Sequence, residues 1–391
     1  CSYALDCVEA ELVHVTTFHA KRVAYMSVCT AEQFGVSGEA LQDLAVCALL
    51  HDNALTQYLH EEFRGDSSAA ECLPELPHLG AHCVMGEENI SALPFHTNVE
   101  NIILYHHENA DGSGSFGKTW QEIPLGARII RLCDLLDAFC RADVFTPDVW
   151  ERANAFLTRV RGRIVDEECA DAFLRAFSEQ HFCSLGGRGL EERLWGKVPR
   201  TKQQLDFAQV KALAKFFAKI VDYKSPFTST HSLGVADDAE CLARFMGFDE
   251  DIAQKMYLAG ALHDIGKVAI GNEILEKPGR LTDSEYAEMK HHAAYTYYVL
   301  SEVQDFAELR DWAAFHHEHL DGTGYPFGKN ESELNTQERI MACVDIYQAL
   351  TENRPYKAGM SHEKACSILL DMAEKGWLDR AIVEQVNACF A

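Results

Sequence analysis

The sequence predicts an all-α protein built from two tandem helical-bundle domains. Apolar residues recur at helical spacing through most of the chain, and no segment alternates apolar and polar residues long enough to predict a strand. A chain of 391 residues is longer than one simple helical core requires, so two domains are expected. One set of histidines and aspartates recurs in both halves, which divides the chain in the same way.

The first half predicts helices separated by turns rich in Gly, Ser and Pro. One helix carries His19 and ends near Gly35, and the next covers 41–52. Residues 60–80 contain Gly, Asp, Ser and two prolines, which predicts a loop. Further helices are expected over 78–90, over 126–140 and, as one or two helices, over 148–182.

Residues 191–204 hold the Gly, Pro and basic residues typical of a linker. We therefore expect one domain over 1–190 and the other over 205–391. In the second half helices are expected over 211–225, 227–247, 250–267, 288–303, 309–318, 338–356, 361–376 and 378–390.

The two halves read as an internal duplication. His231 follows His19 by 212 residues, and the pair His263-Asp264 follows the pair His51-Asp52 by the same interval. The other matches are His82 with His292 and His106-His107 with His316-His317, each at 210 residues, and Asp134 with Asp345 at 211. A nearly constant offset over these five matches predicts one fold used twice.

The motifs of the second half are those of a metal site. Imidazoles and carboxylates on rigid helices hold borderline metals such as iron, manganese or nickel. One His-Asp pair occurs easily by chance, but here HDIGK at 263–267 is followed by HHEHLDGTGYP at 316–326, where Asp321-Gly322 breaks the helix. The alternative is two exposed histidine pairs on core helices, and the combination of motifs argues against it.

This combination resembles the HD-GYP family, a branch of the HD phosphohydrolases. The match spans about 227–357 and includes RIMACVDIYQAL at 339–350 and RPYK at 354–357. The resemblance implies an all-α fold, two or three metal ions and hydrolysis of a cyclic dinucleotide. Family members act on cyclic di-GMP or on 3′3′-cyclic GMP-AMP, and the motifs contain no base-contacting residue that chooses between them.

The resemblance also implies a set of metal ligands: His231, His263, Asp264, His292, His316, His317 and Asp345. Asp264 is expected to bridge two metals that together activate a water molecule. Some family members have a glutamate four residues before the first histidine for a third metal, but Phe227 stands there. Two divalent ions of Fe, Mn or Ni are therefore expected, while His291 and His319 are expected to be solvated.

Three basic residues are expected to bind the substrate. Lys267 follows the His-Asp pair by three residues, so it can reach a phosphate oxygen and act in catalysis with Asp264. The resemblance implies that Arg354 and Lys357 grip the substrate. It also implies that the loop with Tyr325 affects substrate access and contacts a signalling partner protein.

The first half keeps the seven ligand types, which predicts a second metal site formed by His19, His51, Asp52, His82, His106, His107 and Asp134. It has Leu55 in place of Lys267, no counterpart of RPYK, and Gly114-Ser115-Phe116 where the second half has Gly-Tyr-Pro. We therefore expect a degenerate, regulatory domain with reduced or absent hydrolysis. A weak second active site and a purely structural relic are the alternatives.

Composition limits the partners and the location. The formal net charge of −25 argues against binding long nucleic acids, although bound metals still allow a small anionic substrate. No membrane span or signal peptide is visible, and fourteen cysteines without a CxxC pair indicate buried reduced thiols in a cytoplasmic protein rather than disulfides or a zinc site. A homodimer is a candidate assembly, and because the chain begins at Cys1 we expect a preceding segment, such as a sensor or anchor.

Three other functions compete with the phosphodiesterase. A cyclic-dinucleotide sensor without turnover would not need the HDIGK and RPYK motifs, both of which are present. An HD phosphohydrolase acting on nucleoside phosphates and a di-iron oxygenase are disfavoured by the Gly-Tyr-Pro loop.

Overall fold

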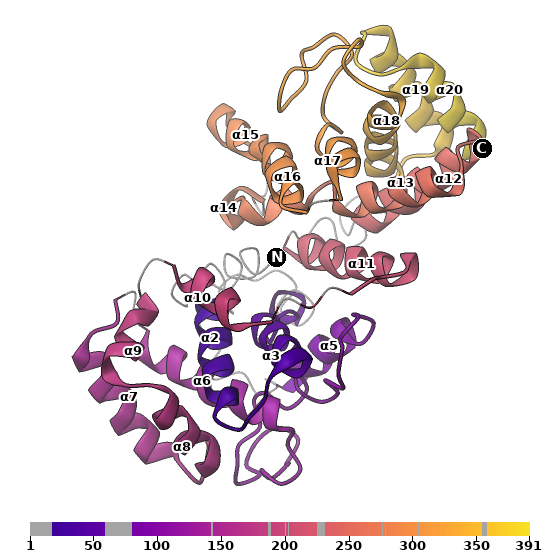
Figure 1. Ribbon diagram of the computed structural model, residues 1–391. Coiled ribbons are helices and arrows are strands. Elements are labelled where there is room, and N and C mark those ends of the chain that lie inside the picture. Colours follow the sequence, from indigo (N-terminus) through magenta and orange to yellow (C-terminus); the bar gives the residue numbers. More distant parts are fainter. Residues whose placement is uncertain are drawn as a thin grey trace. The chain divides into compact units, whose positions relative to one another are not determined.

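The computed structural model describes residues 18–58, 80–141, 144–186, 189–199, 201, 203–224, 231–275, 277, 279–303, 305–353 and 358–391. Within these ranges the protein is helical, which confirms the predicted fold class, and the extended pairings are confined to isolated bridges such as that between Asp321 and Asn330. The chain divides into two compact units, Cys1–Leu205 and Asp206–Ala391 (Figure 1). None of the helices in these ranges combines the length and the apolar character needed to cross a membrane.

The first unit is built around helix α2. Its described elements are α2 His19–Glu32, α3 Gly38–Leu49, α5 Gly80–Ile90, α6 Leu125–Cys140, α7 Pro147–Val160, α8 Glu167–Ala176, α9 Glu179–Cys183, the 3-10 turn η2 Ser184–Gly186 and α10 Leu190–Lys197. Every residue of α2 from His19 to Ala31 is buried, because α3, α6, α8 and α10 all pack against it (Figure 1).

Two stretches of the first unit differ from the expected pattern. The range 148–182 forms three helices, since Gly162 adopts a positive φ of 74° after α7 and Ser178 caps α9. The expected linker 191–204 contains most of α10, which belongs to the first unit. There Leu194 is buried, and Lys197 lies 2.7 Å from Glu32 of α2. The predicted loop at 60–80 falls outside the described residues except for Gly80.

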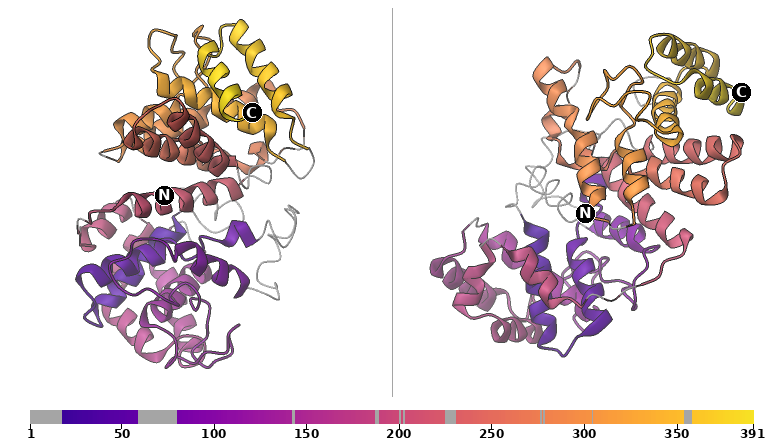
Figure 2. Two further views of the ribbon diagram at one scale, coloured as in Figure 1. Left: turned by 90° about the vertical axis from the view of Figure 1, so that its right-hand side faces the viewer. Right: turned by 45° about the horizontal axis from the view of Figure 1, so that its top comes forward.

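The second unit repeats the arrangement of the first. Its described elements are α11 Phe207–Tyr223, α12 His231–Phe245, α13 Glu250–Leu262, η3 Ile265–Ala269, α14 Asn272–Leu275, α15 Asp283–Met289, α16 His291–Ser301, α17 Ala307–Ala314, α18 Thr336–Thr351, α19 His362–Glu374 and α20 Arg380–Cys389. Helices α12 and α13 form one pair, and α18 packs against both. The closing pair α19 and α20, yellow in Figure 2, lies side by side in both views.

The helix that carries His263 ends earlier than its apolar pattern predicts. Helix α13 stops at Leu262, His263 and Asp264 lie in a turn, and η3 follows. Gly266 explains the change, because its backbone approaches α16 so closely that an added Cβ would lie 2.0 Å from the carbonyl oxygen of His292. The expected helix 288–303 is likewise divided at Lys290 into α15 and α16.

The close packing of α12 on α13 gives a stability prediction. A Cβ added at Gly260 would lie 2.6 Å from the Cα of Ala236, a backbone atom that cannot move aside easily. We expect Gly260→Ala to lower the free energy of unfolding by about 3 kcal/mol, which chemical denaturation would measure.

Gly196→Ala is the matched control, since its added methyl group meets no atom within 4 Å and replaces a helical glycine of α10. It should raise the free energy of unfolding by up to about 1 kcal/mol. Equal stabilities for the two variants would contradict the packing that the structure describes.

Candidate metal sites

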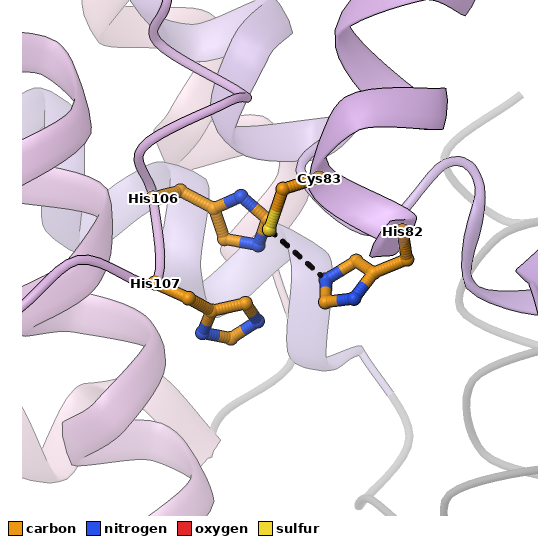
Figure 3. A group of neighbouring side chains, drawn as sticks. All are labelled: His82, Cys83, His106 and His107. Atoms are coloured by element: carbon orange, nitrogen blue, oxygen red, sulfur yellow. Dashed lines mark hydrogen bonds between the residues drawn. The ribbon is translucent and has the colours of Figure 1, made fainter. Parts of the chain in front are cut away.

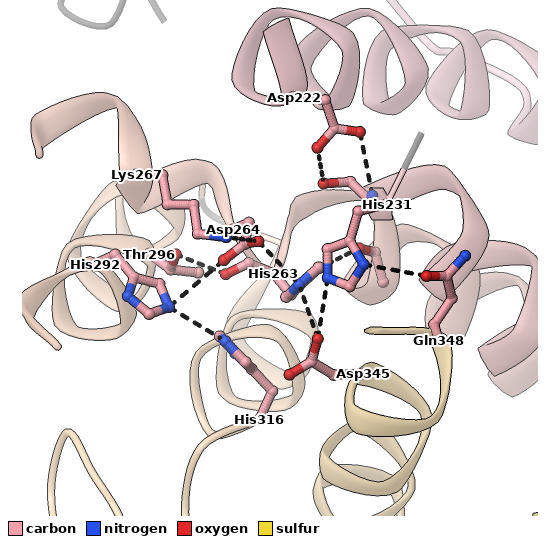
Figure 4. A network of polar contacts seen from close by, with 12 residues as sticks. Asp222, His231, His263, Asp264, Lys267, His292, Thr296, His316, Asp345 and Gln348 are labelled. Atoms are coloured by element: carbon pink, nitrogen blue, oxygen red, sulfur yellow. Dashed lines mark hydrogen bonds and ion pairs between the residues drawn. The ribbon is translucent and has the colours of Figure 1, made fainter. Parts of the chain in front are cut away.

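The structure brings together all seven residues expected as ligands in the second unit. His231 begins α12, His263 and Asp264 follow α13, and His292 lies in the first turn of α16. His316 and His317 follow α17, and Asp345 lies in the middle of α18. All are buried except His317, which is partly exposed (Figure 4 shows most of them).

Backbone carbonyls orient three of these imidazoles. The Nδ1–H groups of His263, His292 and His316 each donate to a carbonyl oxygen three residues earlier in the chain, in every case at 2.7 Å. These bonds occupy Nδ1 and turn Nε2 toward the centre of the cluster. Metal-binding histidines are commonly held in this way, with the second ring nitrogen bonded to a carbonyl.

The two oxygens of Asp264 face different histidines. Its Oδ2 lies 3.3 Å from Nε2 of His263, and its Oδ1 lies 3.5 Å from Nε2 of His292. The donors fall into two groups, in each of which all ligand atoms lie within 4.8 Å of one another. The Asp264 group contains His231, His263 and Asp264, and the His292 group contains His292, His316 and His317.

The spacing of the donors fits metal ions. In the His292 group the Nε2 atoms of His292 and His316 lie 3.4 Å apart, close to the separation of about 3.4 Å between two nitrogens bound tetrahedrally at about 2.1 Å from one ion. Asp345 closes the other side, with Oδ1 at 3.1 Å from Nε2 of His231 and Oδ2 at 3.9 Å from Nδ1 of His317.

The charges inside the cluster shift several pKa values. Burial raises the pKa of Asp264, but His263 and Lys267 outweigh it, so the pKa lies well below its usual range. The pKa of Asp345 is likewise lowered, because His231 and His263 outweigh burial. Lys267 donates to Oδ2 of Asp264 at 2.5 Å, and its pKa is raised since Asp264 outweighs the burial of the ammonium group.

The imidazoles divide into two kinds. Burial lowers the pKa of His292, of His316 and of His317, the last to about 3, so the His292 group is neutral near pH 7. Burial also acts to lower the pKa of His263, but Asp264 and Asp345 raise it to about 9. Neutral imidazoles with a free nitrogen lone pair are the form that binds metals.

Several supporting residues were not predicted from the sequence. Asp222 accepts two hydrogen bonds from Ser232, at 3.1 Å from its backbone N–H and 2.6 Å from its hydroxyl, which fixes the first turn of α12 (Figure 4). Gln348 lies one helical turn after Asp345, and its Oε1 is 3.2 Å from Nδ1 of His231. Asp222 lies outside the motifs. Gln348 lies within the motif at 339–350, and its spacing from Asp345 places both on the same helix face, but no role was predicted for it.

Glu318 holds the loop that contains the Gly-Tyr-Pro motif. Its carboxylate accepts hydrogen bonds from the backbone N–H groups of Phe327, at 2.7 Å, and Lys329, at 2.8 Å. The loop brings the ring of Tyr325 to 4.7 Å from that of His317, so it borders the His292 group. Glu108 makes the same pair of bonds in the first unit, to Phe116 and Lys118.

Some expected residues lie apart from the cluster or outside the described ranges. His291 is exposed and pairs with Glu288, and His319 stacks on Trp377. Phe227, Arg354 and Lys357 lie outside the described residues.

The first unit contains a cluster of the same plan. Oδ2 of Asp52 lies 3.5 Å from Nε2 of His51, and Oδ1 lies 3.4 Å from Nε2 of both His82 and His106. Asp134 is 3.4 Å from His19, as Asp345 is close to His231. Oδ1 of Asp52 therefore faces two imidazole nitrogens at a distance longer than an ordinary N–H···O hydrogen bond, and this spacing fits donors that share one ion.

The surroundings of this first cluster differ from those of the second. Leu55 is buried at the position of Lys267, so the ammonium group of Lys267 has no counterpart at this position. Arg22 and Asp137 form a buried ion pair at 2.6 Å, whereas the second unit has Gly234 and Gln348 at these positions. The first unit therefore has donors for metal but lacks the cation that lies beside Asp264.

The donors form two groups here as well. The His19 group contains His19, His51 and Asp52. The other, the His82 group, has four members: His82, Cys83, His106 and His107.

Comparison with known proteins agrees with this duplicated site. A model of the HD domain matches residues 6–166 and again 215–382. The chain is 29% identical to the 3′3′-cGAMP-specific phosphodiesterase 1 of Vibrio cholerae serotype O1, over 98% of this chain and 88% of that protein. It is 34% identical to the 3′3′-cGAMP-specific phosphodiesterase 3 of the same organism, over 73% of this chain and 62% of that protein.

A cyclic di-GMP phosphodiesterase of Pseudomonas aeruginosa is 38% identical over 36% of this chain and 34% of its own length. The fold is also that of a crystal structure of a cyclic GMP-AMP specific phosphodiesterase of Vibrio cholerae, with a TM-score of 0.63 and 24% identity over all of this chain and 97% of that one. The family model covers both units, and the motifs of the second unit identify the branch. The chain belongs to the HD-domain family, in its HD-GYP branch.

Proposed function

We propose that the second unit is a metal-dependent phosphodiesterase that opens a cyclic dinucleotide to a linear one. The observation that carries this proposal is the position of Asp264, whose two oxygens face two separate groups of donors. A carboxylate so placed can bridge two metal ions. The relatives that match most of this chain are named as cyclic GMP-AMP phosphodiesterases, which supports the reaction class.

The seven clustered residues of the second unit would hold two divalent ions. Neutral imidazoles combined with carboxylates suit Fe, Mn or Ni, which is the choice we propose. Such ions, when bound, would lower the pKa of a water molecule and neutralise charge on the phosphodiester. No side chain is then required as a general base, and burial keeps the pKa of His292, His316 and His317 too low for them to carry protons at pH 7.

Lys267 is proposed to bind the substrate. Its ammonium group is near Asp264 and its side chain is 19% exposed, so it can turn toward a phosphate oxygen at the edge of the cluster. Tyr325 borders the same edge through its contact with His317. Together they would orient the scissile phosphate while the buried donors stay fixed. We propose the same substrate-binding role for Arg354 and Lys357.

The substrate proposal is a cyclic dinucleotide, with 3′3′-cyclic GMP-AMP as the first compound to test. The relatives named for that compound include the two that match 98% and 73% of this chain. The relative in Pseudomonas aeruginosa, named for cyclic di-GMP, matches 36% of it. Cyclic di-GMP is the second compound, since that match still exceeds 35% identity.

We also propose that residues 1–190 form a regulatory domain rather than a second enzyme. Two features of the first unit support this role: Leu55 stands at the position equivalent to Lys267, and Arg22 forms an ion pair with Asp137. A cytoplasmic location is proposed as well, since the described cysteines form no disulfide with one another. A homodimer and a contact of the Gly-Tyr-Pro loop with a signalling protein remain part of the proposal.

A nucleotide panel tests the assignment of activity to the second unit. Reduced protein loaded with iron or manganese would be incubated with 3′3′-cyclic GMP-AMP, cyclic di-GMP and cyclic di-AMP, and products separated by chromatography. Asp264→Ala should abolish the linear product because the bridging carboxylate is lost, whereas the matched variant Asp52→Ala should retain it. Absence of product from all three compounds would refute the phosphodiesterase and favour a sensor.

Replacement of Lys267 should slow turnover without emptying the site. Removal of one preorganised donor to a developing charge typically lowers kcat about 100-fold or more, and we expect this for Lys267→Met. Metal content, measured by mass spectrometry, should stay unchanged because Lys267 is not a metal donor. Lys255→Met is the control, since Lys255 lies on α13, pairs with Asp251 and has a side chain that is 37% exposed. A similar fall in kcat for Lys255→Met would contradict a specific role for Lys267.

Metal binding should release a proton at one group and not at the other. With a pKa near 9, His263 carries a proton in the metal-free protein at pH 7 and must lose it to bind a metal. Affinity at the Asp264 group should therefore rise about tenfold per pH unit from 6 to 9 and then level off. The His292 group is already neutral, so its affinity should change little over the same range.

Calorimetric titration of metal-free protein in two buffers of different ionisation enthalpy would count the protons released at each step. Two binding steps without proton release at pH 7 would contradict the charge state assigned to His263.

A further inference from the structure

The His82 group of the first unit contains a thiol that its counterpart lacks. Cys83 follows His82 on α5, and the corresponding position of the second unit, after His292, is Ala293 (Figure 3). Both residues are completely buried. Among the cysteines that the structure describes, Cys83 is the one that joins a group of possible metal donors.

The geometry of the three histidines is conserved between the two groups. Ring centroids of His82, His106 and His107 lie 5.4, 5.0 and 4.1 Å apart, taking the pairs 82–106, 82–107 and 106–107. The equivalent pairs in the His292 group lie 5.5, 5.2 and 4.1 Å apart. The thiol is therefore an addition to an unchanged frame of imidazoles.

The thiol is placed as a fourth donor. Its Sγ lies 3.6 Å from Nε2 of His82, and the four donor atoms of the group all lie within 4.8 Å of one another (Figure 3). In a tetrahedral zinc site, with sulfur at about 2.3 Å and nitrogen at about 2.1 Å from the ion, neighbouring donors are about 3.6 Å apart. The measured separation of sulfur and nitrogen fits that value.

Neighbouring groups leave suitable nitrogens for an ion. Nδ1 of His106 donates to the carbonyl oxygen of Ile103 at 2.6 Å, so Nε2 is the nitrogen available. Nδ1 of His107 accepts a hydrogen bond from Nη1 of Arg131 at 3.2 Å, so the neutral ring carries its proton on Nε2, and an ion bound at Nε2 would release that proton. Arg131 stands where the second unit has Ala342. Its half-buried guanidinium interacts electrostatically with Cys83 and would offset the negative charge of a zinc-bound thiolate.

We propose that the His82 group binds Zn²⁺ through Cys83, His82, His106 and His107, as a closed structural or regulatory site. Thiolate with imidazole is the donor set that favours zinc, whereas imidazole with carboxylate alone suits Fe or Mn. Four protein donors leave a tetrahedral ion no position for water, and Oδ1 of Asp52 is a further neighbour at 3.4 Å from His82. This cysteine thus departs from the expectation that no thiol binds metal.

The inference concerns metal in the first unit and goes beyond the proposed hydrolysis by the second. The test replaces zinc by Co²⁺ in the full-length reduced protein, because thiolate bound to Co²⁺ gives an intense near-ultraviolet charge-transfer band that imidazole does not. The wild-type protein should show the band. Cys83→Ala, which installs the residue that the second unit has at this position, should lose the band. It should also bind zinc about 100-fold more weakly, because loss of a residue that only orients a metal ligand already lowers metal affinity by about 10- to 100-fold.

Cys183→Ala is the matched control, since Cys183 lies in the same unit but outside every donor group. It should keep the band. A band that persists in Cys83→Ala or disappears in Cys183→Ala would overturn the proposal, and so would a wild-type protein without the band. Circular dichroism would establish that each variant is folded.

A measurement on the wild-type protein alone guards against a misfolded variant. X-ray absorption at the zinc edge, with one equivalent of zinc, should show one sulfur at about 2.3 Å. A shell of nitrogen and oxygen alone would overturn the proposal. Loss of nucleotide hydrolysis with the sulfur signal intact would refute the proposed function and leave this one standing.

Discussion

The structure depends on the burial of carboxylates among imidazoles, which occurs in both units. Moving an isolated carboxylate from water into a medium of low dielectric constant costs about 20 kcal/mol in the idealised limit, so such a group must be surrounded by partners. Asp264 has His263, His292 and Lys267 around it, and their effect on its pKa outweighs that of burial. Helix ends from distant parts of the chain have to meet at this point, and the close approach at Gly266 allows α16 to reach it.

The two units satisfy this requirement with different cations. In the second, Lys267 pairs with Asp264 while part of its side chain remains exposed. In the first, that lysine is a buried leucine, and the arginine Arg22 instead neutralises a different aspartate, Asp137, behind the histidines. A partly exposed lysine can exchange its partner for a substrate phosphate. Arg22 and Asp137 form a buried bidentate pair, and moving Arg22 away would leave an uncompensated buried charge on Asp137. Arg22 is therefore not available to bind a substrate.

The sequence predicted the helices and the members of both clusters because these depend on local periodicity and on a repeat that preserves spacing. It did not predict features set by neighbours in space. The end of α13 at Leu262 follows from the contact of Gly266 with α16, and α10 forms because Leu194 is buried against the first unit. Arg131 likewise is one of four charged residues of α6 in the sequence, and only the structure places it beside His107. The sequence pattern identifies what repeats and which motif residues differ, whereas the contacts that the differing residues make are visible only in three dimensions.

Three of the differences between the units lie near the shared ligands, while the ligands themselves are kept. Cys83 stands next to His82, Leu55 lies three residues after Asp52, and Arg131 lies three residues before Asp134. The imidazoles keep their positions despite these changes, because the distance between the rings of His82 and His107 is nearly the same as that between His292 and His317. A metal that turns over substrate needs an open position and a nearby cation, whereas one that supports a fold needs neither. Under the roles proposed for the two units, residues beside the shared ligands, one of which adds a fourth donor, would convert one kind of site into the other.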